Sequence, residues 1–287
     1  MRTTRLLPLA LAAALSTVAG CATPATAPQA VAATDLAALD VALAGDWRTD
    51  ANIARDRYRH PRETLAFFGV RPGDNVVEIT PGGGWYAEIL APYLHADGRY
   101  LAALVDPMAL PAGGGRDFQQ RARNTFDAFV AKQPARYDRV QAVAFDPAAP
   151  RFGADGAADA VLTFRNVHNW VGAGTAQGYF DGFFRALKPG GVLGVVEHRA
   201  NPGTDMETMK KSGYLTEALV IDYATRAGFV LEAKSEVNAN PADAKDHPNG
   251  VWTLPPSNRH DEADRAKYAT IGESDRMTLR FRKPRPD

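Results

Sequence analysis

A carboxylate followed by a cluster of glycines is the first feature of this chain that could do chemistry. The sequence Val76-Val77-Glu78-Ile79-Thr80-Pro81-Gly82-Gly83-Gly84 runs from an apolar segment through Glu78 into three consecutive glycines. Glycines at such a turn let a ligand approach the backbone closely, because they carry no side chain. A helical pattern of apolar residues follows the turn. A strand, a glycine turn and a helix in this order are typical of nucleotide-binding α/β folds.

Further reactive side chains follow the later apolar segments of the chain. These side chains are Asp106 after the second segment, Asp146 after the third, His168 after the fourth, and Glu197 with His198 after the fifth. Ligands bind at the carboxyl ends of the strands in open parallel sheets, so we expect these groups to share one edge. The alternative is that each acid is an ordinary surface carboxylate at the end of a strand.

The two histidines are the candidate general bases. His168 stands in Arg165-Asn166-Val167-His168-Asn169-Trp170, and histidine titrates in the range that a base at neutral pH requires. His198 is the second candidate. The alternative for His168 is a neutral, hydrogen-bonded imidazole that packs beneath its loop.

Strands and helices alternate along most of the chain. Strands are expected at residues 76–79, 100–105, 140–145, 158–164, 192–196, 229–237 and 277–282. Helices are expected near residues 36–43, 61–68, 86–91, 122–130, 180–187 and 215–227. This rhythm predicts a parallel sheet with helices on both faces. The clean alternation of Met277-Thr278-Leu279-Arg280-Phe281-Arg282 predicts a half-exposed antiparallel strand.

Two polar segments allow a structural and a functional interpretation. Residues 47–60 are dense in charge and form either a solvated helix with paired charges or a cover over a ligand pocket. Residues 238–274 are rich in Pro, Asn and Asp and include His247, Trp252 and Tyr268. We expect a lid there, and the alternative is a surface excursion with no ligand contact.

Composition bounds the class of protein. The 287 residues contain 33 basic and 33 acidic side chains, so the formal charge is zero and no nucleic-acid surface is indicated. The length favours one large domain. The six histidines show no His-x-x-x-His spacing and no neighbouring cysteine, so we expect no metal site.

The first 20 residues read as a signal peptide. Arg2 and Arg5 precede an apolar segment of residues 6–19, which is too short to span a bilayer as a helix. The segment ends in Val18-Ala19-Gly20-Cys21, which resembles the lipobox of bacterial lipoproteins, and Cys21 is the only cysteine. We expect a lipid on Cys21 to anchor a periplasm-facing protein in the cell envelope. The alternative is cleavage after Ala27, which discards Cys21.

A flexible tether is expected at residues 21–35, and one domain at residues 36–287. Once Leu187-Lys188-Pro189-Gly190-Gly191 is included, this domain resembles class I S-adenosylmethionine-dependent methyltransferases. The resemblance rests on the order of Glu78 before the glycines, Asp106, Asp146 and this turn. It implies a Rossmann-like sandwich around a mostly parallel seven-stranded sheet with an antiparallel last strand. The segment leading into the glycines is similar to a group of bacterial methyltransferases without an assigned substrate.

The resemblance also implies roles for individual residues. Gly82, Gly83 and Gly84 would contact the methionine part of S-adenosylmethionine, with Glu78 near its ammonium group. Asp106 would bind the ribose hydroxyls and Asp146 the adenine amino group, and a small molecule would accept the methyl group. The family has a glycine where this chain has Thr80, and the Thr80 side chain occupies space that is usually open.

Two other functions fit the same residues. The pattern Gly82-x-Gly84-x-x-Ala87 matches the dinucleotide fingerprint, so an NAD(P)-dependent oxidoreductase is one alternative. Glu78 opposes that alternative, because it would face an incoming diphosphate. The other alternative is an exported binding or scaffold protein that keeps the methyltransferase fold without turnover, because S-adenosylmethionine is made in the cytoplasm.

Overall fold

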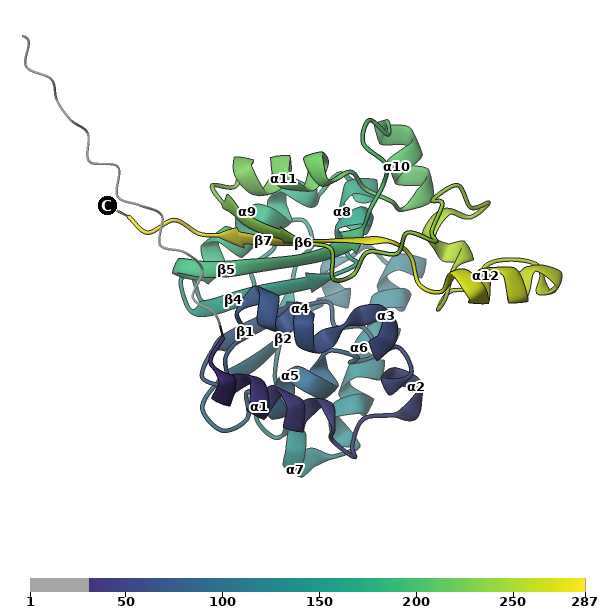
Figure 1. Cartoon of the computed structure of the whole chain (residues 1–287). Coiled ribbons are helices and arrows are strands. Elements are labelled where there is room, and N and C mark those ends of the chain that lie inside the picture. Colours follow the sequence, from purple (N-terminus) through teal and green to yellow (C-terminus); the bar gives the residue numbers. More distant parts are fainter. Residues whose placement is uncertain (1–30, 287) are drawn as a thin grey trace, which may run out of the picture.

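A seven-stranded sheet forms the centre of the computed structural model, which describes residues 31–286 (Figure 1). The strands are β1 (Asn75–Ile79), β2 (Arg99–Val105), β3 (Gln141–Phe145), β4 (Ala158–Phe164), β5 (Leu187–His198), β6 (Val230–Ser235) and β7 (Arg276–Arg282). Their order in the sheet is β3-β2-β1-β4-β5-β7-β6. The pairs among β1 to β5 are parallel, whereas β7 is antiparallel to both β5 and β6. The expected mostly parallel sheet with an antiparallel last strand is confirmed.

Helices cover both faces of the sheet (Figure 1). One face carries α1 (Ala33–Leu43), α4 (Pro61–Phe68), α5 (Ala87–Tyr93), α6 (Gly114–Ala131) and α7 (Pro134–Tyr137), and the other carries α8 (Val167–Ala173), α9 (Ala176–Ala186) and α11 (Glu217–Arg226). Successive strand residues point to opposite cores, so Val76 packs with α4 and α5 while Val77 packs with α8 and α9. Burial on both faces explains why the parallel strands read as continuous apolar runs.

The N-terminal region differs in detail from the prediction. Helix α1 begins at Ala33, three residues earlier than expected. Residues 47–60 form two short helices rather than one, α2 (Asp50–Ile53) and α3 (Asp56–Arg59). The Thr49 side chain caps α2, and His60 ends α3 with a positive φ of 40°. This break lets the segment turn across the carboxyl ends of the strands.

Strand β7 is buried, so the prediction of a half-exposed strand was wrong. All of its residues except Arg282 are buried, including Arg276, Thr278 and Arg280. The polar face of β7 is covered by residues that the sequence places far away. Asn238 donates to Thr278 Oγ1 at 3.0 Å, and Arg280 donates to the carbonyl of Phe67. The alternating pattern was real, but its polar side faces a network of hydrogen bonds instead of solvent.

The insertion at residues 238–274 lies at the carboxyl end of the parallel strands. It contains η2 (Gly250–Thr253), η3 (Glu262–Asp264) and α12 (Arg265–Ile271). Figure 1 shows α12, α10 (Met206–Ser212), α2 and α3 gathered at this end of the sheet, opposite the C-terminus. The helices and loops that are added to the basic sheet-and-helix fold therefore lie at the carboxyl edge of the sheet.

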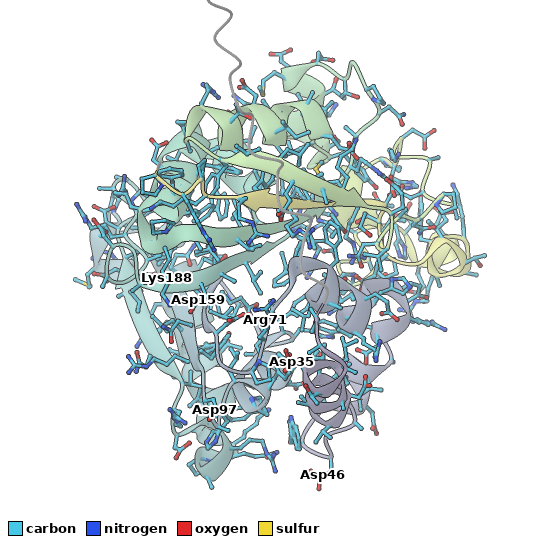
Figure 2. All side chains as sticks on the ribbon, turned by 60° about the vertical axis from the view of Figure 1, so that its left-hand side comes forward. Asp35, Asp46, Arg71, Asp97, Asp159 and Lys188 are labelled. Atoms are coloured by element: carbon cyan, nitrogen blue, oxygen red, sulfur yellow. The ribbon has the colours of Figure 1, made fainter. Side chains whose placement is uncertain are left out.

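The amino edge of the sheet holds Lys188 of the Lys-Pro-Gly-Gly turn. Its ammonium group contacts both carboxylate oxygens of Asp159, at 2.7 and 2.8 Å, and Figure 2 shows the two side chains next to each other. The Lys-Pro-Gly-Gly turn thus ties β4 to β5 on the side away from the candidate site. Lys188 contributes to the fold and not to the chemistry.

The expected signal peptide, Cys21 and residues 21–30 of the tether lie outside the described residues. Among residues 31–286, no helix combines the length and the apolar character needed to cross a membrane.

Candidate functional site

A cavity of about 340 Å³ lies at the carboxyl ends of β1, β4 and β5. Its walls come from four parts of the chain: the end of β1 with the turn after it, the ends of β4 and β5 with the residues after β4, the 47–60 segment, and the 238–274 insertion. Of the residues expected at the site, the cavity is lined by Glu78, Thr80, Gly82, Gly83, His168 and His198. Sequence positions more than a hundred residues apart therefore meet in one place.

The glycine turn presents its backbone to this cavity. A methyl group built on Gly82 or Gly83 would meet no atom within 4 Å, so the space above both residues is open. Gly82 has a φ of 60°, which favours glycine. Gly84 differs, because a methyl group there would lie 3.0 Å from the ring of Phe129, and Gly84 does not line the cavity.

Thr80 stands where the methyltransferase loop that this chain resembles has a glycine, and the backbone of Thr80 is strained. Its φ of 46° lies in the left-handed region, which is unusual for a β-branched residue. Its Oγ1 is buried and has no hydrogen-bond partner among the described residues. Strain of this kind concentrates at functional sites.

Glu78 is a buried carboxyl group beside the turn. It is 3% exposed, and the Tyr100 hydroxyl donates to its Oε2 at 2.7 Å. Burial raises the pKa of Glu78 to about 8, although the Tyr100 hydrogen bond and the charge of Arg59 act in the opposite direction. Glu78 is therefore mainly neutral at pH 7 until a cation comes near it.

His168 and Glu197 form a buried pair on the opposite wall. His168 Nδ1 lies 2.9 Å from Glu197 Oε1, and the backbone N–H of His168 donates to Oε2 at 3.2 Å. The N–H of His198 donates to Glu197 as well, at 2.8 Å. Three donors suit an ionised carboxylate, which holds the Nδ1–H tautomer of His168. No described residue hydrogen-bonds His168 Nε2, so this nitrogen is available to a ligand in the cavity.

His198 lies next to His168, with ring centroids 5.1 Å apart. Its Nδ1 is 2.5 Å from the Ser274 hydroxyl oxygen. Burial lowers the pKa of His198 well below its ordinary value, and the neighbouring His168 and Arg165 lower it further. His198 is therefore a neutral hydrogen-bonding group, and His168 is the better placed of the two candidate bases.

The same three residues lie close enough to raise the question of a metal ion. Ligand atoms of His168, Glu197 and His198 lie within 4.8 Å of one another. Both oxygens of Glu197 already accept hydrogen bonds, and the Nδ1 atoms of both histidines are engaged. Because these hydrogen bonds link the three residues to one another and to Ser274, we interpret the group as a proton-handling network. The absence of a metal site stays a prediction.

Asp106 and Asp146 lie at the same edge but outside the cavity. The Asp106 carboxylate accepts a hydrogen bond from the Met108 N–H at 2.9 Å and caps η1 (Pro107–Ala109). The Asp146 carboxylate accepts from the Ala148 N–H at 2.8 Å, and Asp146 is exposed. Each carboxylate keeps further acceptor capacity for a ligand, but neither converges with Glu78 on the cavity.

Several residues of the cavity were not singled out from the sequence, although the alternative of a pocket cover at residues 47–60 agrees with the cavity lining. Arg55, Arg59 and Arg165 line the cavity, together with Glu273. Glu273 could have been found from the direction of β7, because an antiparallel strand begins at the edge where the parallel strands end. The pairing of His198 with Arg276 places the residues just before Arg276 beside the two histidines.

The 238–274 insertion forms part of the cavity wall. Trp252, Pro255, Pro256 and Ser257 line the cavity, and the Trp252 ring lies 6.0 Å from that of His168. His247 instead pairs with Asp243 at 2.8 Å inside the insertion. Of the three residues expected in the lid, only Trp252 reaches the cavity.

Comparison with known proteins identifies the fold. No protein-family model and no curated protein match the sequence. A methyltransferase from Aquifex aeolicus, described as S-adenosylmethionine-dependent, has 16% identity and a TM-score of 0.52, with 80% of this chain and 93% of that chain covered. The [4+2]-cyclase SpnF has 18% identity and a TM-score of 0.54, with coverages of 85% and 86%.

A third solved structure is similar over most of its length. A protein from Galdieria sulphuraria has 13% identity and a TM-score of 0.53. It is described as a sarcosine dimethylglycine methyltransferase whose activity was assigned without a direct demonstration. The match covers 82% of this chain and 86% of that chain. Identities at this level show the fold alone. The chain has the Rossmann-like fold of class I S-adenosylmethionine-dependent methyltransferases.

Proposed function

We propose that this protein is an S-adenosylmethionine-dependent methyltransferase that acts on a small molecule whose accepting atom gives a proton to His168. One observation carries the proposal: the open glycine turn and His168 line the same cavity, and Glu197 holds His168 from behind the cavity wall. The turn offers backbone to a cofactor, and the pair offers a base to an acceptor. The fold supports the cofactor class but leaves the acceptor open.

The residues present fit the cofactor. The backbone of Gly82 and Gly83 would hold its methionine part, and Glu78 would pair with its ammonium group. Asp106 and Asp146 have acceptor oxygens for the ribose hydroxyls and the adenine amino group. When bound, S-adenosylmethionine supplies a methyl group on a sulfonium, which is a good leaving group.

The chain's own residues would then position and deprotonate the acceptor. His168 would take the proton with Nε2, and the Glu197 carboxylate would stabilise the resulting imidazolium from the Nδ1 side. Glu197 is fully buried, so this stabilisation is weakly screened by water. Trp85 and Trp252 at the cavity wall would exclude water around the reacting atoms.

Calorimetry with S-adenosylmethionine, followed by methyl transfer to a small-molecule extract, tests the proposal. We expect micromolar binding and labelled product. His168→Asn should keep the binding but lower the transfer rate by about 10²- to 10⁴-fold, the range for losing a general base. His95→Asn is the matched control, because His95 is exposed and pairs with Asp138 away from the cavity. Equal rates for the two variants would contradict the role of His168.

A non-catalytic binding protein is the second candidate. Thr80 favours it, because its side chain stands in strained backbone where the family has glycine. The fold also leaves the reaction open, since SpnF is described as a [4+2]-cyclase. Failure to bind S-adenosylmethionine would favour this candidate, and binding of NAD(P) instead would favour the oxidoreductase.

We also propose that a lipid on Cys21 anchors the protein in the bacterial envelope, facing the periplasm. The support is the sequence Val18-Ala19-Gly20-Cys21 and the absence of any other cysteine. Cys21→Ser should remove the lipid label and release the protein from the membrane fraction. Membrane attachment that survives this substitution would contradict the proposal.

A further inference from the structure

Three arginine side chains face the candidate cavity with little to balance their charge. Arg55 and Arg59 come from the 47–60 segment and Arg165 from the residues after β4, and all three line the cavity. Arg276 lies buried behind them. The carboxylate of Glu273 is the common partner of this group, since the charges of all four arginines act on it.

The Glu273 carboxylate leaves much of the arginine hydrogen-bonding capacity unused. It accepts from Arg55 Nε at 2.6 Å, from Arg59 Nε at 3.2 Å and from Arg276 Nη2 at 2.6 Å. The Nη2 atoms of Arg55 and Arg59 are buried and have no partner among the described residues. Arg59 is 3% exposed and lines the cavity, so its unpartnered donor lies at the cavity wall and not on the outer surface.

Arg165 has even fewer partners. Its side chain makes no hydrogen bond or ion pair with any residue in the described range. Burial and the nearby Arg276 lower the pKa of Arg165 to about 10, and burial together with Arg165 lowers the pKa of Arg59. The guanidinium groups thus repel one another across the cavity. Arg165 is half-buried, whereas the Nη2 donors of Arg55 and Arg59 are buried and are costly to leave unpaired unless a ligand satisfies them.

We propose that Arg55, Arg59 and Arg165 form an anion-binding subsite that takes a carboxylate or phosphate group of the methyl acceptor. Planar guanidinium groups bind both anions through paired hydrogen bonds. The charge of Arg59 lowers the pKa of Glu78 beside the glycine turn and the pKa of His198 beside the candidate base. Glu78 and His168 line the same cavity as the arginines, so an anion bound there shares the space with the glycine turn and with the candidate base. The proposal rests on the proposed function only in calling the bound molecule the acceptor.

The cofactor's own carboxylate is a competing source of negative charge. The excess of guanidinium groups over carboxylates favours a second anion, because four arginines act on Glu273 and, among the described residues, the one other carboxylate that acts on Arg165 is Glu197. Glu78 does not reduce this excess at neutral pH, since burial raises its pKa to about 8. An acceptor anion would add the missing charge on the side of the cavity where the base lies.

Thermal unfolding and calorimetry with inorganic phosphate and with acetate test the subsite in the full-length protein, at constant ionic strength. We expect at least one of the two anions to raise the unfolding temperature of the wild type. Arg165→Gln should weaken binding of that anion by tenfold or more. This variant leaves no described protein group without a partner, so it should fold. Arg226→Gln is the control, because Arg226 pairs with Asp222 on α11.

Titration of the same variants with S-adenosylmethionine separates the two sources of the anion. An affinity that changes less than threefold in Arg165→Gln, with anion binding lost, supports an acceptor subsite. A tenfold loss of cofactor affinity would assign the arginines to the cofactor and overturn the proposal. Anion binding that is absent in the wild type, or equal in Arg165→Gln, would overturn it too. If the wild type binds the anion but not the cofactor, the subsite stands and the methyltransferase function fails.

Discussion

The carboxyl edge of the sheet has two halves that look alike in sequence and differ in structure. At β1, β4 and β5, polar residues converge on a cavity in whose walls Glu78 and His168 are buried. At β2 and β3, Asp106 and Asp146 cap their own turns and do not line that cavity. An acid at the end of a parallel strand is thus compatible with both outcomes.

The difference comes from what covers each half. Trp85 donates to the carbonyl of Asn52 at 3.0 Å, and Arg59 lies over the Trp85 ring at 4.6 Å. Arg55 pairs with Glu273, so the N-terminal segment is joined to the end of the insertion. These contacts lower the local dielectric over β1, β4 and β5. Elements outside the sheet therefore add to the burial that the neighbouring strands give to this half.

Glu273→Gln should show the largest effect on stability. The substitution leaves four buried or half-buried guanidinium groups without their carboxylate, and removing one partner of a buried ion pair costs about 3–5 kcal/mol. The pKa of Glu273 is about 2, because the four arginines outweigh the effect of burial. Its contribution is therefore complete above pH 4.5 and lost as the pH falls toward 2. Urea unfolding between pH 3 and pH 7 measures both the size and the pH dependence.

Asp146→Asn is the matched control from the exposed half of the edge. Its stability should stay close to that of the wild type at every pH. If Asp146→Asn lowered the free energy of unfolding as much as Glu273→Gln does, the two halves of the carboxyl edge would not differ in their contribution to stability.

Glu78→Gln should change the pH dependence of stability. The folded-state pKa of Glu78 is about 8, compared with an ordinary value of 4.5. The folded state therefore binds a proton that the unfolded state has lost, and the wild type loses stability as the pH rises from 4.5 to 8. Without this carboxyl group, the unfolding free energy should fall less steeply over the same range. Urea unfolding at pH 5, 7 and 9 checks this, and equal slopes in the two proteins would contradict the shifted pKa.

The same proton gives a signature for ligand binding. A cationic group beside Glu78 would lower its pKa, so binding of S-adenosylmethionine near pH 7 should release a proton. Calorimetry in buffers of different ionisation enthalpy measures this release. Glu78→Gln should abolish it.

The sequence was sufficient for the sheet because each strand carries its own local signal. Continuous apolar runs and glycine turns mark β1, β2 and β4, and these signals need no distant partner. The buried state of β7 could not be predicted, because the residues that cover its polar face come from Phe67 and Asn238. Local pattern specifies the strand, and distant packing decides what its polar side contacts.

For the candidate site, too, the sequence predicted the residues at strand ends but not the distant residues that pack against them. Glu78 lies at the end of a strand and Gly82 and His168 follow strands, so their shared edge could be expected from topology. Arg59 and Glu273 lie in segments whose charges look like an ordinary solvated surface in sequence. Their burial depends on a break between two short helices and on the path of a long insertion, and neither has a local signature.

Asp106→Asn should show whether the open half of the edge also binds the cofactor. If Asp106 accepts hydrogen bonds from ribose, the affinity for S-adenosylmethionine should fall about tenfold, since hydrogen bonds to a charged group are worth about 1.5–3 kcal/mol. Calorimetry with Asp106→Asn and Asp117→Asn compares this residue with an acid of the first turn of α6. Unchanged affinity in both variants would confine cofactor binding to the half at β1, β4 and β5.

Thr80→Gly should have the smallest effect on stability and a clear effect on binding. Glycine relieves the left-handed strain at φ 46°, which is worth about 1–2 kcal/mol, but it also loses about 0.5–1 kcal/mol of backbone entropy on folding. The two terms nearly cancel, so the unfolding free energy should change by about 1 kcal/mol or less. Removing the side chain opens the turn where the ligand approaches the backbone, so the affinity for S-adenosylmethionine should rise. A lower affinity would instead show that the buried Thr80 hydroxyl, which has no partner among residues 31–286, is itself a ligand contact.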